Sequence, residues 1–190
     1  MTTWHEAVGP GSRSELQYAP EGDSKPRQRI GRIVLVDSRE QKPLLDVPED
    51  GSEVELVVDS VLVRARRATL RTGDYALEGA ADELLVERKA SAEELAACVG
   101  AGRDRFVREL ERMAREARRG VLLCEFPAAD LEGMARSRLS ARTVVGTLGS
   151  WILDFGLVPV FAGDRRGAAR WLVRTFGALD RRLTTTTRAA

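Results

Sequence analysis

The sequence predicts an α/β domain in which helices flank both faces of a central mixed β-sheet. Short apolar runs of the kind that form buried strands occur at 33–36, 54–58 and 61–65. The stretch 43–52 is rich in Pro, Gly and acidic residues, as loops are. From residue 84 onward, strand-like runs alternate with helical patterns instead. We therefore expect the early strands to follow one another as a meander, and the later strands to be separated by helices.

The later elements follow from capping and periodicity signals. Residues 84–89 begin with an apolar run and predict a strand. Ser91 is suited to cap a helix through its side-chain oxygen. The acidic residues that follow it suit the positive N-terminal end of that helix. Apolar residues at helical spacing predict a second helix at about 103–118. The remaining elements are a strand at 121–126, a helix at 143–155, a strand at 157–161 and a helix that starts after Asp164.

The length of 190 residues suits one domain with tails. Residues 1–29 contain Gly, Pro, Ser and scattered charges without periodicity, so we expect a flexible N-terminal tail. Residues 30–178 would form the globular domain. Residues 179–190 include a run of threonines and are expected to form a flexible C-terminal tail.

Composition argues against several classes of protein. No apolar run approaches the ~20 residues of a membrane span, and the N-terminus lacks the layout of a signal peptide. The two cysteines form no C-x-x-C motif, which favours reduced thiols and a cytoplasmic location. His5 is the only histidine, which argues against a zinc site. The net charge of +1 lacks the basic excess of a protein that binds DNA by bulk charge.

The strongest functional pattern is a pair of carboxylates and an ammonium in a short strand–turn–strand segment. Asp74 follows a glycine that suits a turn, and Glu87 and Lys89 lie two residues apart in the predicted strand 84–89. Side chains alternate along a strand, so Glu87 and Lys89 share a face and Arg88 points the other way. Carboxylates hold a hard cation through oxygen, and a lysine can orient or deprotonate a water. The pattern predicts a hydrolytic Mg²⁺ site.

Several residues keep two interpretations open. Lys89 could be an ordinary lysine exposed at a strand end, although lysine occurs only three times in this arginine-rich chain. Glu125 interrupts an apolar strand, so it lies either at the edge of the site or in an ion pair. Arginines on the second helix are either solvated or contact phosphate, namely Arg108, Arg112, Arg115 and Arg119. Aromatic residues near the C-terminus fill either the core or a dimer surface, namely Trp151, Phe155, Trp171 and Phe176.

Four segments in order carry a resemblance to a known family. They are Val36-Asp37-Ser38-Arg39-Glu40, Gly73-Asp74-Tyr75, Glu87-Arg88-Lys89 and Gly102-Arg103. This set resembles the nuclease motif of the XPF family of structure-specific endonucleases, in the PD-(D/E)XK superfamily. The resemblance runs from about residue 32 to residue 176 and implies a restriction-endonuclease-like core. The family usually places an Asp shortly after E-R-K, and here the candidates are Glu93 and, one residue later and favoured, Glu94.

The resemblance also implies roles for the residues of the site. Asp74, Glu87 and the backbone carbonyl of Arg88 would hold Mg²⁺ or Mn²⁺, and Lys89 would position the attacking water. Asp37 and Glu40 would lie at the rim of the site, to hold a metal-bound water or a second ion. Contacts to DNA phosphate, or orientation of the acids, are expected of Arg39, Arg88 and Arg103.

Substrate and partners are implied in the same way. Members of the family cut branched DNA such as flaps and forks, and pair through their nuclease domains. Many also carry a tandem helix-hairpin-helix domain, for which the residues after Phe176 are too few, so we expect the stand-alone, phage-type form. A homodimer or a DNA-binding partner is expected, through residues 143–155 and 165–177. The alternatives are an inactive nuclease-fold scaffold, another PD-(D/E)XK nuclease, or a structural domain with a surface ion-pair network.

Overall fold

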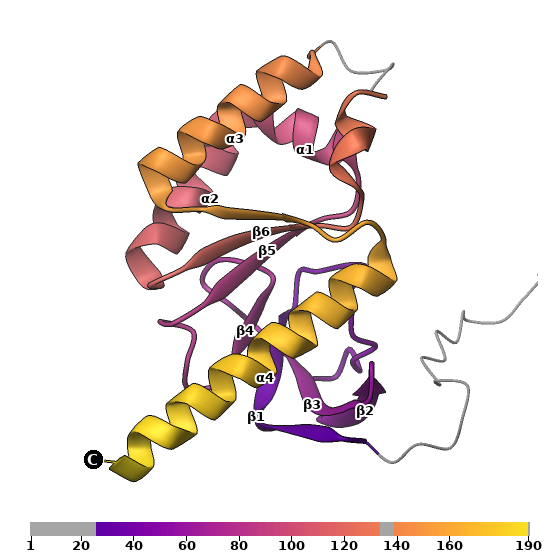
Figure 1. Cartoon of the computed structure of the whole chain (residues 1–190), viewed down its shortest axis with the longest axis vertical. Helices are drawn as coiled ribbons and strands as arrows, with labels where there is room; N and C mark the ends of the chain where they lie inside the picture. The colour runs from indigo at the N-terminus through magenta and orange to yellow at the C-terminus, as the bar shows by residue number, and fades with distance from the viewer. Residues whose placement is uncertain (1–25, 134–138, 190) are drawn as a thin grey trace, which may run out of the picture.

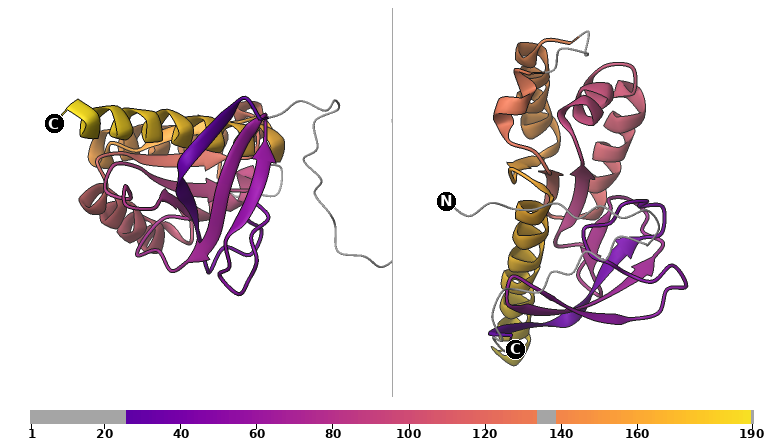
Figure 2. Two further views of the ribbon diagram at one scale, coloured as in Figure 1. Left: turned by 90° about the horizontal axis from the view of Figure 1, so that it is seen from below. Right: turned by 90° about the vertical axis from the view of Figure 1, so that its right-hand side faces the viewer.

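A computed structural model describes residues 26–133 and 139–189. Its centre is one seven-stranded mixed sheet with strand order β2-β3-β1-β4-β5-β6-β7, and helices cover both faces (Figures 1 and 2). The predicted fold class, an α/β domain with a restriction-endonuclease-like mixed sheet, is confirmed. No helix in the described parts of the chain combines the length and the apolarity that crossing a membrane requires.

Most elements lie at the predicted ranges, whereas β4 and η1 had no predicted range and α4 is longer than expected. The strands are β1 (Gln28–Asp37), β2 (Val54–Val58), β3 (Val61–Ala68), β4 (Tyr75–Leu77), β5 (Leu85–Lys89), β6 (Gly120–Cys124) and β7 (Val158–Phe161). The helices are α1 (Ala92–Val99), α2 (Arg103–Glu116), the short 3₁₀ helix η1 (Ala128–Leu131), α3 (Ala141–Phe155) and α4 (Arg165–Ala189).

The early strands do not form the expected meander. β2 and β3 form a hairpin, but β3 then lies parallel to β1, and β1 is antiparallel to β4 on its other side. The long loop after β1 carries the chain to the sheet edge before β2 begins, so the hairpin returns with β3 beside β1. Strand pairing between distant segments is not encoded in the local apolar pattern. The later strands β5, β6 and β7 are separated by helices, as predicted, and they pair in parallel.

Each face of the sheet has its own hydrophobic core. α4 crosses one face and buries Ala168, Leu172, Val173 and Phe176 against β1 and its neighbours. α1, α2 and α3 cover the other face, around Leu95, Phe106, Leu110 and Trp151. In Figure 1, strands β5 and β6 run between α1, α2 and α3 on one side and α4 on the other. Trp151 and Phe176 therefore fill the core, whereas Phe155 and Trp171 are only partly buried.

The predicted helix caps are present. Ser91 Oγ accepts a hydrogen bond from the Glu94 N–H at 3.2 Å, at the start of α1. Asp164 Oδ1 accepts one from the Gly167 N–H at 2.6 Å, at the start of α4. Both side chains satisfy donors that the first helical turn leaves free. The sequence signals therefore located both helix starts.

The predicted C-terminal tail, 179–190, is wrong, because α4 continues to Ala189. Asp180 ties this extension to β1: its carboxylate accepts hydrogen bonds from the Gly31 N–H at 2.7 Å and from Arg32 Nη1 at 2.6 Å. The hydroxyls of Thr184, Thr185 and Thr186 donate to carbonyls one turn earlier, as Thr184 does to Asp180 at 2.8 Å. At the other end, β1 starts at Gln28 and shortens the predicted tail 1–29, of which residues 1–25 lie outside the described residues.

Candidate active site

A polar cavity of about 440 Å³ opens where three strands meet at one edge of the sheet. β1 and β5 run in the same direction on either side of the antiparallel β4. The carboxyl ends of β1 and β5 therefore meet the start of β4, the kind of edge where α/β proteins place their sites. The lining residues are Asp37, Arg39, Glu40, Gln41, Lys42, Gly73, Asp74, Glu87, Arg88, Lys89, Ala90, Glu94 and Glu109.

Asp74 and Glu87 face this cavity from neighbouring strands. Gly73 has a φ of +75°, which favours glycine, and the turn leads directly into β4. Asp74 Oδ2 then accepts a hydrogen bond from the Arg88 N–H at 2.7 Å. Burial, together with the nearby charge of Glu87, raises the pKa of Asp74 to about 8, and burial also raises the pKa of Glu87. A cation between these two carboxylates would relieve both effects.

Lys89 lies beside Glu87 on the same face of β5, as the alternation of side chains predicted. Its Nζ is 2.6 Å from Glu87 Oε1 and 4.8 Å from the centre of the Phe106 ring. Lys89 is buried, so its interpretation as an exposed strand-end lysine is wrong. Burial alone would lower the pKa of Lys89, but the carboxylate of Glu87 raises it above its usual value. The neighbouring carboxylate therefore favours the ammonium form of Lys89, which can orient a water.

Asp37 is buried at the end of β1 and its acceptors are occupied. Its two oxygens take hydrogen bonds from the Arg39 N–H and guanidinium, at 2.7–3.0 Å, and from the Leu70 N–H at 2.8 Å. Burial would raise the pKa of Asp37, yet these donors lower it. Its contacts support a role in positioning Arg39, whose side chain is 65% exposed at the cavity, more than they support metal binding.

Arg88 points to the opposite face of β5 and is fully engaged there. Its Nε and Nη2 donate to Glu40 at 3.1 and 3.0 Å, and its Nη1 donates to Glu125 Oε1 at 2.6 Å. Only 7% of its side chain is exposed, which favours orientation of the acids over contact with a phosphate. Glu125 is thus a paired residue, and Arg165 Nη1 approaches the same oxygen at 3.2 Å.

Comparison with known families and structures agrees with this geometry. The model of the ERCC4 domain matches residues 36–175, a range that contains all of the cavity. The chain belongs to the ERCC4 domain family. Its fold is similar to XPF from Aeropyrum pernix, with a TM-score of 0.57 and 23% identity over 85% of this chain and 69% of that chain.

A second structure of XPF from Aeropyrum pernix, in complex with DNA, gives the same TM-score of 0.57 with 22% identity over 80% of this chain and 66% of that chain. No curated protein matches the sequence. The resemblance to the XPF-family nuclease domain, made on four short segments, is thereby confirmed. Three of those segments contribute residues to the cavity, and Gly102-Arg103 does not.

Two further residues predicted for the site, Glu94 and Arg103, differ in their position relative to the cavity. Glu94 lines the cavity, with Oε1 3.7 Å from Lys89 Nζ and Oε2 accepting from the Ala90 N–H at 2.8 Å. It therefore satisfies the start of α1 and also borders the site. Arg103, by contrast, is exposed at the start of α2 and is not among the residues that line the cavity. A phosphate contact by Arg103 stays a prediction for a more distant part of the substrate.

The sequence interpretation missed Glu109, which lines the cavity from α2. Its Oε1 accepts hydrogen bonds from Thr72 Oγ1 at 2.7 Å and from the Gly73 N–H at 3.3 Å, so it braces the turn before Asp74. Burial would raise the pKa of Glu109, but these donors and Arg112 lower it. In the sequence, the signal that could have identified Glu109 was its position beside the apolar stripe of α2. Arg112 is accordingly engaged by Glu109.

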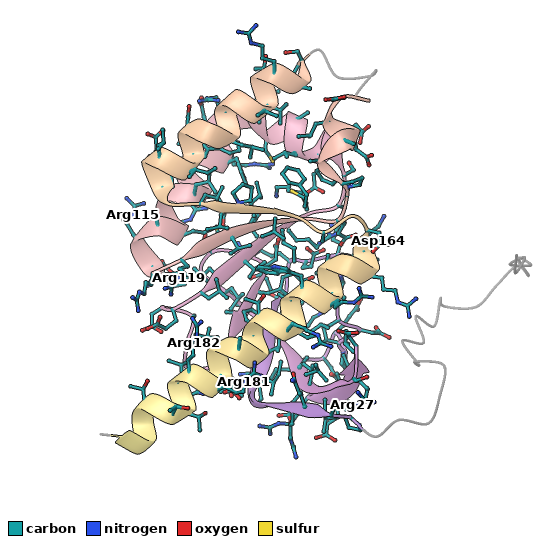
Figure 3. The ribbon with its side chains drawn as sticks, viewed as in Figure 1. Arg27, Arg115, Arg119, Asp164, Arg181 and Arg182 are labelled. Atoms are coloured by element: carbon teal, nitrogen blue, oxygen red, sulfur yellow. The ribbon has the colours of Figure 1, made fainter. Side chains whose placement is uncertain are left out.

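The other arginines predicted as a stripe on α2 do not reach the cavity. α2 ends at Glu116, so Arg119 lies beyond it, 3.9 Å from Glu83. Figure 3 shows Arg115 and Arg119 at the outer edge of the molecule, on the side opposite Asp164. The solvated interpretation therefore fits these two residues better than contact with phosphate near the site.

The residues that face the cavity suit one hard cation. Within the described residues, no group of three or more Asp, Glu, His or Cys side chains is arranged around a common metal position. The candidate ligands are instead two carboxylates, Asp74 and Glu87, which repel each other in a site with little solvent. Oxygen donors of this kind suit Mg²⁺ or Mn²⁺, with waters or backbone oxygens completing the coordination.

Proposed function

We propose that this ERCC4 domain is a divalent-metal-dependent endonuclease that hydrolyses phosphodiester bonds in DNA. The observation that carries the proposal is the pair of carboxylates on one cavity, Asp74 partly buried and Glu87 buried, with the ammonium of Lys89 2.6 Å from Glu87. Asp74, Glu87 and the backbone carbonyl of Arg88 would hold Mg²⁺ or Mn²⁺. The ion would supply Lewis-acid stabilisation of charge on the scissile phosphate.

The remaining residues of the cavity have separate roles in this proposal. Lys89 orients the attacking water through its ammonium, in a pocket where electrostatic interactions are strong. Asp37 holds Arg39 at the cavity, where the exposed guanidinium can meet a phosphate. Glu40 holds Arg88, whose backbone N–H in turn fixes Asp74. Glu94 borders Lys89 and would tune the position of the water.

We infer branched DNA as the substrate, in repair, recombination or phage DNA processing. The likeness to XPF from Aeropyrum pernix in complex with DNA supports DNA as the ligand, and the family resemblance supports flaps and forks. The test is cleavage of labelled flap, fork, four-way and linear DNA of one sequence, in Mg²⁺, Mn²⁺ or EDTA. Preferred cutting of branched forms in metal supports the proposal. Equal cutting of linear DNA would favour another PD-(D/E)XK activity, and no cutting with intact binding would favour an inactive scaffold.

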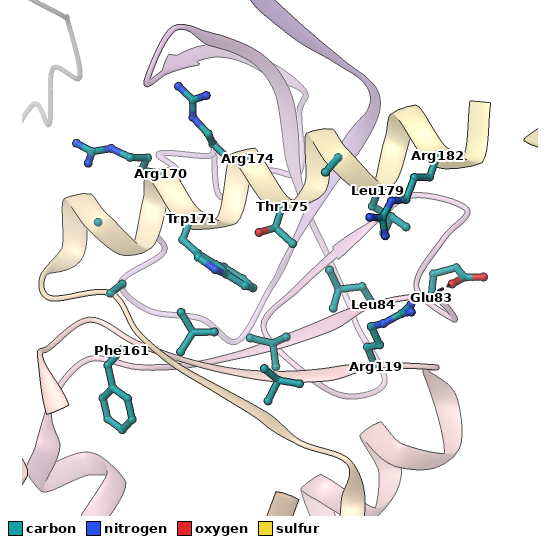
Figure 4. Close-up of a pocket in the computed structure, with 16 residues that line it drawn as sticks. Glu83, Leu84, Arg119, Phe161, Arg170, Trp171, Arg174, Thr175, Leu179 and Arg182 are labelled. Atoms are coloured by element: carbon teal, nitrogen blue, oxygen red, sulfur yellow. Dashed lines mark ion pairs between the residues drawn. The ribbon is translucent and has the colours of Figure 1, made fainter. Parts of the chain in front are cut away.

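We also propose that the domain pairs, as a homodimer or with a DNA-binding protein, through α3, β7 and the first half of α4. Several apolar residues there are exposed, namely Val145, Ile152, Leu153 and Val158. A groove of about 730 Å³ lies alongside, between α4 and strands β6 and β7, and Figure 4 shows Trp171 projecting into it from α4. Because Trp151, Leu172 and Phe176 are buried in the monomer, they cannot contribute to such an interface.

Light scattering at micromolar concentration tests the pairing. A dimer that dissociates in Leu153→Asp, a change at a side chain 86% exposed in the monomer, supports it. A monomer that cuts branched DNA at full rate without a partner would contradict it. The cytoplasmic location stays a prediction; both free cysteines, Cys98 and Cys124, are buried, as expected of thiols that form no disulfide.

A further inference from the structure

The loop between β1 and β2 brings one unpaired cation to the cavity. Four basic residues line the cavity, and three of them, Arg39, Arg88 and Lys89, are each held by a carboxylate. Lys42 differs, because no carboxylate of the described residues forms an ion pair with it. It is exposed, so its ammonium is available to a ligand that enters the cavity.

The backbone of Lys42 is nevertheless fixed on both sides. Its N–H donates to Glu40 Oε1 at 2.8 Å, and its carbonyl accepts from Arg165 Nη1 at 3.1 Å. The next carbonyl, of Pro43, accepts from Arg165 Nη2. An exposed side chain on an ordered backbone loses less freedom when it binds, because the loop is already in place.

Arg165 is itself anchored in the protein. It is the first residue of α4, and its Nη1 lies 3.2 Å from Glu125 Oε1. The same oxygen accepts from Arg88 Nη1 at 2.6 Å, and Arg88 holds the side chain of Glu40. Glu125 therefore binds two guanidiniums, and both hold the loop 40–43. Arg88 holds the loop through the side chain of Glu40, and Arg165 holds it through the backbone carbonyls of Lys42 and Pro43.

We propose that Lys42 binds a phosphate of the substrate at the mouth of the cavity, and that Arg165 is the positioning residue that fixes the loop carrying it. The inference rests on the proposed nuclease function and adds a substrate contact to it. A lysine ammonium is a point charge that meets a phosphate oxygen from many directions, so it needs a placed backbone more than a planar fit. The clamp supplies that placement.

The test compares Lys42→Ala, Lys42→Arg and Arg165→Ala with a matched control, Arg166→Ala. Arg166 is exposed, one residue from Arg165, and makes no ion pair within the described residues, so its loss removes the same charge without the clamp. Binding of a fluorescent flap DNA is measured by anisotropy in Ca²⁺ at several salt concentrations. KM and kcat are measured by cleavage in Mg²⁺.

Lys42→Ala should weaken DNA binding roughly fivefold at ~0.1 M salt and reduce the salt slope by roughly 0.7–0.9, the value of one phosphate contact. KM should rise while kcat stays nearly constant, and Lys42→Arg should restore binding. Arg165→Ala should weaken binding in the same direction, and should add little in a Lys42→Ala background because both act on one contact. Arg166→Ala should leave the salt slope of binding and KM close to those of the wild type.

An unchanged salt slope in Lys42→Ala would overturn the proposal. Equal losses in Arg165→Ala and Arg166→Ala, or additive losses in the double variant, would remove the positioning role. Thermal unfolding is recorded for every variant. If Arg165→Ala does not fold, the phosphate contact is tested by Lys42→Ala and Lys42→Arg, and the positioning role of Arg165 is tested by Arg165→Lys. A wild-type protein that binds DNA but never cuts it would refute the nuclease function instead, which separates the two failures.

Discussion

Replacing Arg88 by methionine should destabilise the fold strongly, because it strips a buried carboxylate of its charge partner. The side chains of Glu40 and Glu125 are each only 8% exposed. In Arg88→Met, Glu125 keeps Arg165 at 3.2 Å, but Glu40 keeps only the N–H of Lys42. Removing one partner of a buried ion pair costs about 3–5 kcal/mol. That is a large part of the ~5–15 kcal/mol by which domains are stable.

Urea unfolding near neutral pH measures this loss, with Arg103→Met as the control. Arg103 is exposed, so the free energy of unfolding of the Arg103→Met variant should differ from that of the wild type by less than about 0.5 kcal/mol. The loss should also depend on pH. Burial raises the pKa of Glu40 but Arg88 outweighs it, so the folded pKa is lowered. The pair therefore stabilises the wild type above the pKa of an unfolded glutamate, ~4.3, and this contribution is lost as the pH falls through the folded pKa.

Without Arg88, Glu40 can take up a proton on acidification, and the difference between variant and wild type should shrink toward about pH 4. Arg88→Met combined with Glu40→Met should recover much of the stability, since an apolar pair replaces an ionic one. A loss below ~1 kcal/mol at neutral pH would refute the reasoning. So would a difference that stays constant on acidification, because both results would mean that the network is solvated.

Three further predictions concern the cavity. Asp74→Asn and Glu87→Gln should each abolish cleavage without changing the circular dichroism spectrum, because each removes one charge from the cation site; wild-type rates in either would contradict the assignment. Lys89→Arg should keep DNA binding but lose about 10²–10⁴-fold in turnover, and a loss under ~10-fold would make Lys89 a phosphate anchor only. Burial raises the folded pKa of Asp74 to about 8, above its unfolded value. Protonation of Asp74 therefore stabilises the folded protein at low pH, and this stabilisation is lost as the pH rises through 8. In EDTA the melting temperature should therefore fall from about pH 5 to about pH 8, and this fall should disappear in Mg²⁺ and in Asp74→Asn; a melting temperature that is flat in EDTA would show that Asp74 is not strained by burial.

The local features of this protein could be predicted because their physical causes are local. Alternation along a strand placed Glu87 and Lys89 on one face of β5 and Arg88 on the other. The left-handed turn at Gly73 and the caps at Ser91 and Asp164 depend on residues a few positions apart. The ordered motif segments carried the family and, with it, the type of fold.

The tertiary structure alone decided which charges pair, because burial and partner choice depend on segments far apart in the chain. Arg88 was expected either to contact a phosphate or to orient the acids, and Glu40 and Glu125 enclose it and leave it almost no solvent. Glu109 joined the site because α2 packs beside the turn at Gly73. The C-terminal helix persists to Ala189 because Asp180 finds its donors on β1, at the opposite end of the chain. A sequence pattern contains the donors and acceptors, whereas the fold sets their distances and the water between them.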